Sequence, residues 1–315
     1  MLTSTALVLL MTLPGIALFY GGMVRKKSVL NTMASVVAIA ALVTLLWFMG
    51  LGTLFVDAPI AHWVWEPGGW IAKSCALDFV GGSVVHINAG VAGLVCTYFL
   101  GQRRGYGREP FEPFNLGLTM AGARLLWVGW FGFNAGSAVA SDGRAELAML
   151  VTQIAAASAA MTWMFAEWIV RRRPSLLGLC SGLVAGLVAI TPASGYVSPR
   201  AALAIGAISG IACYWGATGL KRLLKADDSL DVFGVHGIGG IVGCLLTGVF
   251  ASKTIGGVEG SVLTQAIGAG AVLVYSLFMT AILLGVTLFI TGLRTDERSE
   301  IEGMDVSQHR ERLGA

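Results

Sequence analysis

Long apolar stretches follow one another through almost the whole sequence, and polar loops separate them. A helix needs about 20 apolar residues to cross the roughly 30 Å hydrocarbon core of a bilayer. Nine stretches reach this length, so we expect an all-α polytopic membrane protein built as a bundle of about nine transmembrane helices. The predicted spans cover residues 2–23, 33–58, 79–100, 115–137, 145–170, 175–193, 201–221, 232–252 and 264–293.

Composition supports a membrane protein and excludes several other classes. Charged residues make up only 12% of the 315 residues, against about a quarter in soluble domains. The net charge of +3 is small and no basic run is interleaved with aromatic residues, so we expect no nucleic-acid partner. The five cysteines form no CxxC pair, and four lie inside apolar stretches, which predicts reduced packing residues without a disulfide or zinc framework.

The loops alternate in charge and thereby predict the orientation of the chain. Sixteen of the 21 lysines and arginines fall in loops on one side, together with the polar tail, and four fall on the other side. Cytoplasmic loops carry the excess of Lys and Arg, so we expect the N-terminus outside and the C-terminus in the cytoplasm. This predicts a multi-pass protein of the cell (inner) membrane, with a transmembrane domain over 1–293 and a short cytoplasmic tail over 294–315.

Two histidines lie inside predicted spans. His86 follows Asp78, at the outer start of its span, by eight residues, which places it about 12 Å deep. His236 enters from the opposite face by about 8–10 Å, so the two imidazoles are expected to meet near the midplane. Ionisable residues inside membranes are usually functional, although two unrelated buried imidazoles remain the alternative. A pair could relay a proton or pass a small polar solute, whereas the absence of further ligands at metal spacing argues against a metal site.

Two aspartates stand at the predicted starts of the histidine-bearing spans. A carboxylate there accepts hydrogen bonds from free backbone N–H groups and suits the helix dipole. We therefore predict that Asp78 and Asp231 are N-caps. The GxGGxxG run at 237–243 lies in a span with no strand before it, so we interpret it as close helix packing and not as a dinucleotide site.

Several long motifs occur in order between Leu2 and about Arg294: MTLPGIALFYGGMVRKKSVLNTM, IAHWVW, LDFVGGSVVHINAGVAGLV, GWFGFNAGSA, PSLLGLCSGLVAGLVAITPASGYV and DDSLDVFGVHGIGGIVGCLLTGVF. Together they closely resemble the ammonium transporter (Amt) family of the Amt/Rh superfamily. The tail segment EIEGMDVSQH is similar to the cytoplasmic C-terminal segment of that family.

The resemblance implies transport of ammonium or ammonia, with no cofactor and no enzymatic activity. It also implies a homotrimer that is surrounded by membrane lipid, with one conduction path through each subunit. It implies that NH4+ is recruited at an outer vestibule, loses its proton and crosses a hydrophobic pore. It also implies a PII-type nitrogen signal protein as a cytoplasmic partner. By motif match, the twin pore histidines are His86 and His236, the vestibule residues are Trp65 and Ser137, a gate phenylalanine is Phe133, and the aspartate below the vestibule is Asp78.

The chain departs from the family pattern by an internal deletion. The pattern has eleven spans, and about two are missing between LVTLLWFMG, ending at Gly50, and APIAHWVW, starting at Ala58. The missing third span would carry the other gate phenylalanine, so one wall of the pore is expected to be open or filled by lipid or a neighbouring subunit. Arg124 stands where the family has a small residue, and it either snorkels to the cytoplasmic end or repels cations in the pore.

The deletion leaves a second function open. A transport-dead membrane scaffold or ammonium sensor would keep the vestibule and tail without a sealed path. A membrane enzyme using the two histidines is a third reading, but the sequence shows no nucleophile or metal-ligand spacing that supports it.

Overall fold

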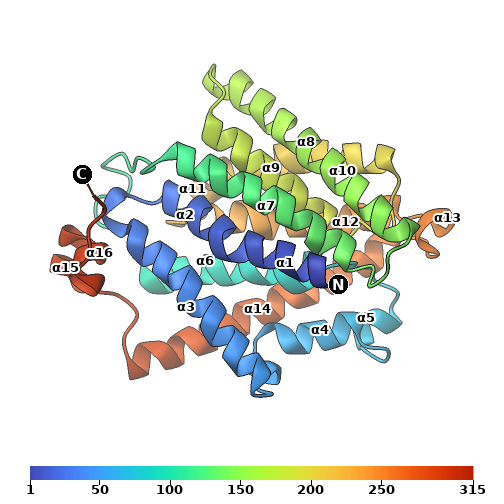
Figure 1. The fold of residues 1–315 in the computed structure, drawn as a ribbon, viewed down its shortest axis with the longest axis horizontal. Helices are drawn as coiled ribbons and strands as arrows, with labels where there is room; N and C mark the ends of the chain where they lie inside the picture. The colour runs from blue at the N-terminus through green and yellow to red at the C-terminus, as the bar shows by residue number, and fades with distance from the viewer. Residues whose placement is uncertain (315) are drawn as a thin grey trace.

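The structure is a computed structural model, and it describes residues 1–314. Within this range it is a bundle of helices without strands, and most helices run along the long axis of the molecule (Figure 1). The N-terminus lies at one end of the bundle and the C-terminal helices lie at the other (Figure 1). Eight helical units are long and apolar enough to cross a membrane, and one shorter apolar helix, α9 (Leu176–Ile190), lies among them.

The membrane-crossing units agree with the predicted spans to within a few residues, except for the second. The first span is α1 (Leu2–Leu10), the π-helical turn η1 (Met11–Ile16) and α2 (Ala17–Met23). The later units are η4 (Gly82–Ile87) with α6 (Asn88–Leu100), α7 (Leu116–Gly136), α8 (Gly143–Arg171), α9, α10 (Pro199–Trp215) with η5 (Gly216–Leu220) and α11 (Lys221–Leu223), η6 (Phe233–Gly237) with α12 (Ile238–Phe250), and α14 (Val262–Ile290).

The predicted span over 33–58 is wrong at both ends. The helix is α3 (Val29–Phe48), and it stops because Gly50 adopts a left-handed conformation with φ +77° just after the helix end. The chain then makes the short turn η3 (Gly52–Leu54) and the separate helix α4 (Asp57–Trp65), which α5 (Trp70–Lys73) follows. α3 packs against the first span and the tail, and only 6% of the residues in its most apolar stretch are buried.

Polar side chains define where the helices start. Asn115, Asp142, Ser175, Ser198 and Ser261 each accept a hydrogen bond from a backbone N–H in the first turn of α7, α8, α9, α10 and α14. These bonds satisfy donors that a helix cannot pair internally. Each cap therefore marks a boundary between a loop and a membrane-crossing helix.

Glycines bring the helices into close contact, as predicted for the run at 237–243, where a Cβ on Gly243 would overlap the carbonyl oxygen of Ala189. A Cβ on Gly186 or Gly206 would overlap the carbonyl oxygen of Ala155 on α8. A Cβ on Gly122 of α7 would overlap the backbone nitrogen of Phe19 in the first span. In lipid, where the hydrophobic effect does not drive helices together, such close backbone contact supplies the packing energy.

The C-terminal segment folds back on the bundle as α15 (Glu297–Glu302) and α16 (Met304–His309). The short helix α13 (Lys253–Gly256) lies at the opposite end of the bundle (Figure 1). The Asp305 side chain is buried and accepts hydrogen bonds from the amides of Leu30 and Asn31, so it caps α3 from the tail. Lys27 donates to the backbone oxygen of Glu300 at 2.6 Å. The tail therefore anchors the start of the loosely packed α3.

Candidate functional site

Two π-helical turns carry His86 and His236 to the same place in the bundle. η4 and η6 each hold one histidine near their ends, and the Nδ1 atoms of the two rings lie 3.4 Å apart. The ring centroids are 5.4 Å apart with the planes inclined by 37°. Turns of this kind are rare and concentrate at functional sites. The predicted meeting of the two imidazoles is therefore seen in the fold.

Each π turn begins under an aspartate eight residues before its histidine. The carboxylate of Asp78 accepts from the amides of Gly81, Gly82 and Ser83 at 2.7–2.8 Å and so caps η4. At the second turn the cap is Asp228, which accepts from the amides at positions 232 and 233 at 3.0 and 2.9 Å.

The predicted cap Asp231 is therefore wrong. Its carboxylate instead pairs with Lys221, and its backbone sits at φ +55°. The pairing partly offsets the burial that raises the pKa of the Asp231 carboxyl. The repeated spacing, Asp78 to His86 and Asp228 to His236, was the sequence signal that distinguishes the true cap.

Thr191, just beyond the end of α9, orients His86. Its hydroxyl donates to the Leu187 carbonyl at 2.7 Å, as a threonine one turn on from that carbonyl does. The oxygen is then left to accept, and it lies 3.0 Å from the indole nitrogen of Trp130 and 3.3 Å from Nε2 of His86. Because the hydroxyl has one proton and two lone pairs, His86 carries its proton on Nε2. Sequence reasoning missed Thr191.

The proton on Nε2 of His86 determines the direction of the remaining hydrogen bonds in this line. With Nε2 protonated, Nδ1 of His86 accepts, so His236 donates from its own Nδ1 across the 3.4 Å separation. Nε2 of His236 is then an acceptor, and it lies 3.4 Å from the hydroxyl of Tyr20 on α2. A continuous line of hydrogen bonds therefore runs from Thr191 through both imidazoles to Tyr20, and every proton in it has an acceptor.

Aromatic rings form the surroundings of the histidine pair. The His86 ring stacks on Trp130 with centroids 5.4 Å apart and meets Phe133 edge-on at 6.4 Å. The pair borders a cavity of about 380 Å³ lined mostly by apolar side chains of the first span, α6 and α7. A neutral, small hydrogen-bonding solute finds partners there on the imidazoles and on the hydroxyls of Thr12 and Tyr20, whereas a bare cation finds no carboxylate among the lining residues.

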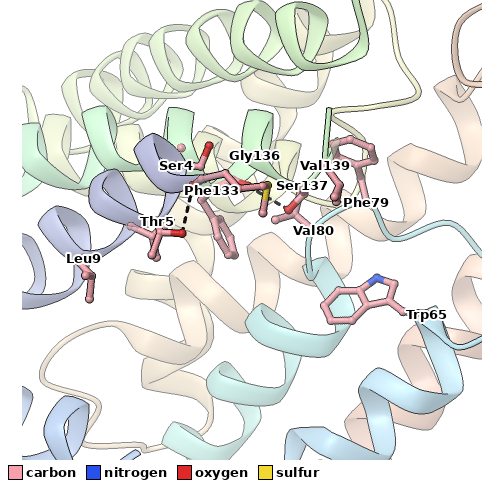
Figure 2. A pocket seen from close by; sticks show the side chains of 13 residues that line it. Ser4, Thr5, Leu9, Trp65, Phe79, Val80, Phe133, Gly136, Ser137 and Val139 are labelled. Atoms are coloured by element: carbon pink, nitrogen blue, oxygen red, sulfur yellow. Dashed lines mark hydrogen bonds between the residues drawn. The ribbon is translucent and has the colours of Figure 1, made fainter. Parts of the chain in front are cut away.

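A second cavity of about 560 Å³ opens at the end of the bundle that holds the N-terminus, and Figure 2 shows its lining. Trp65 lies across this cavity from Ser137 and Phe133. The Trp65 indole donates to the Asp78 backbone oxygen at 2.7 Å, which holds the ring in place. Ser137 donates to the Phe133 carbonyl at 3.0 Å, so its oxygen retains lone pairs for a ligand.

The two cavities share two lining residues, Val8 of α1 and Phe133 of α7. Because both side chains are apolar and border both cavities, we interpret them as an apolar constriction between the outer cavity and the histidines. Phe133 was singled out from the sequence, but Val8 was not, because an apolar residue in a span carries no distinguishing signal. Phe79 borders only the outer cavity and Phe19 only the inner one, so no second phenylalanine shares the position of Phe133 between the two.

Arg124 does not line either cavity. Its side chain is exposed on the surface of the bundle, so the interpretation that Arg124 repels cations within the pore is not supported. A long side chain there can extend its guanidinium along the helix toward the aqueous boundary.

Comparison with known proteins places these features in context. The profile of the Ammonium Transporter Family matches residues 1–58 and 48–313, two matches that meet where the deletion was predicted. An ammonium transporter of Aquifex aeolicus is 39% identical over 99% of this chain and 92% of its own length. An ammonium transporter of Bacillus subtilis is 36% identical over 97% of this chain and 95% of its own.

The fold is similar to solved structures as well. The crystal structure of Candida albicans Mep2 superimposes with a TM-score of 0.85 at 29% identity, covering 94% of this chain and 85% of that one. The alignment with the Aquifex protein has 392 positions and this chain has 315 residues, so at least 77 positions have no counterpart here. That length is sufficient for two membrane crossings of about 20 residues each and their loops.

Proposed function

Because the chain belongs to the ammonium transporter family and is a multi-pass membrane protein, we propose that it carries ammonium nitrogen across the membrane through the cavity at His86 and His236. The observation that carries the proposal is the imidazole pair, 3.4 Å apart, beneath an apolar constriction that leads to an outer cavity. NH4+ is recruited in the outer cavity and loses its proton there. NH3 passes the constriction and the imidazole pair relays the proton, so one positive charge crosses with each nitrogen and a current results.

Recruitment uses the residues that face the outer cavity. The π face of Trp65 attracts a cation, and the Ser137 oxygen accepts a hydrogen bond from it, which together replace part of the ion's hydration. The carboxylate of Asp78 is fully engaged with backbone amides, so it holds the geometry of η4 and does not contact the ion. Its negative charge still favours a cation in the cavity above.

Selectivity follows from the constriction and the histidines. Val8 and Phe133 offer no oxygen ligands, so Na+ or K+ would lose hydration without compensation. NH3 is neutral and exchanges hydrogen bonds with the ring nitrogens in passing. The hydrogen-bond line from Thr191 to Tyr20 keeps the two rings in one register, so the solute meets a preorganised path.

We further infer that the protein acts as a homotrimer in the cell (inner) membrane, with the N-terminus outside and the tail over 294–315 in the cytoplasm. The basic loops lie at the same end of the bundle as α15 and α16, which suits a cytoplasmic face. That face is where a PII-type signal protein would bind.

The test is the current across proteoliposomes after an ammonium pulse, compared with a His86→Ala/His236→Ala double variant. We expect a saturable current that Na+ and K+ do not evoke and that the double variant alters. A correctly inserted protein that shows no current would refute transport.

A second function is favoured by one observation, the absence of α3 and α4 side chains from the lining of the inner cavity. A path with an incomplete wall would leak or fail, and the protein would then be an ammonium sensor or scaffold. Ammonium-dependent changes in tail protection from hydrogen exchange, without current, would support this alternative.

A further inference from the structure

The first span and α6 face each other across the inner cavity without a helix between them. The first span packs against α7 and α3, while α6 packs against α14 and η6. Within residues 1–314, no helix packs extensively against both. α3 slants across this side of the bundle toward α4, but neither helix contributes a side chain to the inner cavity (Figure 1). The wall is therefore incomplete on this side.

Residues that line the cavities are exposed at membrane depth along this gap. Leu9 of α1 borders the outer cavity about 12 Å from the start of the helix, and 52% of it is exposed. Ala89, one turn beyond His86 on α6, borders the inner cavity and is also exposed. These positions lie where the bilayer is the surrounding medium.

We propose that the gap between the first span and α6 is a lateral opening to the hydrocarbon core and that a lipid acyl chain occupies it and completes the wall of the cavity. The inference rests on the proposed function in treating this cavity as the transport path. An acyl chain is apolar and flexible, which matches an uncharged wall of Val8, Ile16 and Val85. Water in the same opening would have no polar partners on these side chains.

The distribution of glycine argues for a lipid and against a protein helix as the occupant. Many helix contacts in this molecule are built on glycine, and every glycine of the two facing spans points at another element. Gly15 of the first span faces α7 and Gly21 faces α3, while Gly90 and Gly93 of α6 face residues of the segment around η6. Apart from Ala89, the gap is bordered by bulky or branched side chains such as Val8, Ile16 and Val85, which hold a neighbouring helix backbone at a distance.

Three tryptophans make the inference testable. Trp130 borders the inner cavity, whereas Trp163 is enclosed between helices and meets Tyr214 edge-on, and each is only 4% exposed. Trp168 is 52% exposed on α8 and serves as a lipid-facing reference. Lipids brominated at the middle of the acyl chain quench tryptophan fluorescence on contact. The emission of each residue is obtained as the difference between the parent protein and its Trp→Phe variant.

In vesicles of such lipids and without ammonium, we expect the Trp130 component to be quenched, though less than that of the exposed Trp168, and the Trp163 component to be preserved. The variant Ala89→Met should reduce quenching of Trp130 alone. If Trp130 is protected like Trp163, a second copy, another protein or the bundle itself covers the gap, and the inference is overturned. Unchanged quenching of Trp130 in Ala89→Met would also overturn it, because the lipid would then reach Trp130 by a route other than the gap between the first span and α6. The quenching experiment does not measure transport. A protein that shows quenched Trp130 but no ammonium current would therefore refute the proposed transport and leave the lipid-filled opening supported.

Discussion

Replacing Thr191 with valine isolates the hydroxyl that orients the histidine pair. Valine preserves the shape of the side chain but removes the acceptor of two buried donors, the indole N–H of Trp130 and Nε2–H of His86. Leaving a buried donor unsatisfied costs about 1–3 kcal/mol. We therefore expect Thr191→Val to lower the free energy of unfolding by about 2–6 kcal/mol.

A matched control is present in the same network. Thr152 is also a buried threonine that donates to the carbonyl one turn earlier, and it accepts from a single donor, Nδ2 of Asn134. Thr152→Val therefore leaves one donor unsatisfied and should cost about 1–3 kcal/mol. Thr191→Ser keeps the hydroxyl and should remain close to the parent protein in both stability and transport.

The assay combines unfolding in detergent with ammonium current in proteoliposomes. Without Thr191 the proton of His86 is free to move to Nδ1, which places two donors face to face across the 3.4 Å separation from His236. Current should fall more in Thr191→Val than in Thr152→Val. Equal destabilisation of the two variants, together with unchanged current in Thr191→Val, would refute the assigned hydrogen-bond line.

Three further predictions follow from single contacts. Asp228→Asn should lower the melting temperature more than Asp231→Asn, since only Asp228 caps η6; the reverse order would contradict the assignment of the cap. Gly122→Ala should disrupt the contact of α7 with the first span and reduce the yield of folded protein, whereas Gly285→Ala, in open space, should not. Burial tends to raise the pKa of Glu300, but hydrogen bonds from arginine and a backbone amide outweigh it and leave the pKa lowered. Docking of the tail should therefore be strongest above the pKa of Glu300 in the unfolded chain, about 4.3, and should weaken as pH falls through the lower pKa of the folded state. Hydrogen exchange of residues 297–309 would measure this change, and protection that does not depend on pH would contradict it.

The sequence by itself determined the class of the fold and the main chemical groups. Bilayer thickness demands long apolar helices, so most helix boundaries are visible in the pattern of apolar residues, although eight units and not the nine predicted are long enough to cross. His86 and His236 stood out because ionisable side chains are rare in spans, and their depths of about 12 Å and 8–10 Å from opposite faces indicated that they meet near the midplane. The position of the deletion was also evident, since motifs on either side are local features of the chain.

Only the tertiary structure decided which side chains contact the two histidines and cap the turns that carry them. The spacing of eight residues before the histidine favours Asp228 over Asp231 as the cap, but the contacts themselves depend on where the chain turns before η6 and on the position of Lys221. Thr191 and Val8 carry no local signal, because their roles arise from elements distant in the chain. The same holds for the open side of the cavity: apolar helices such as α3 are stable against protein or lipid alike, so apolar pattern alone does not determine which one they face.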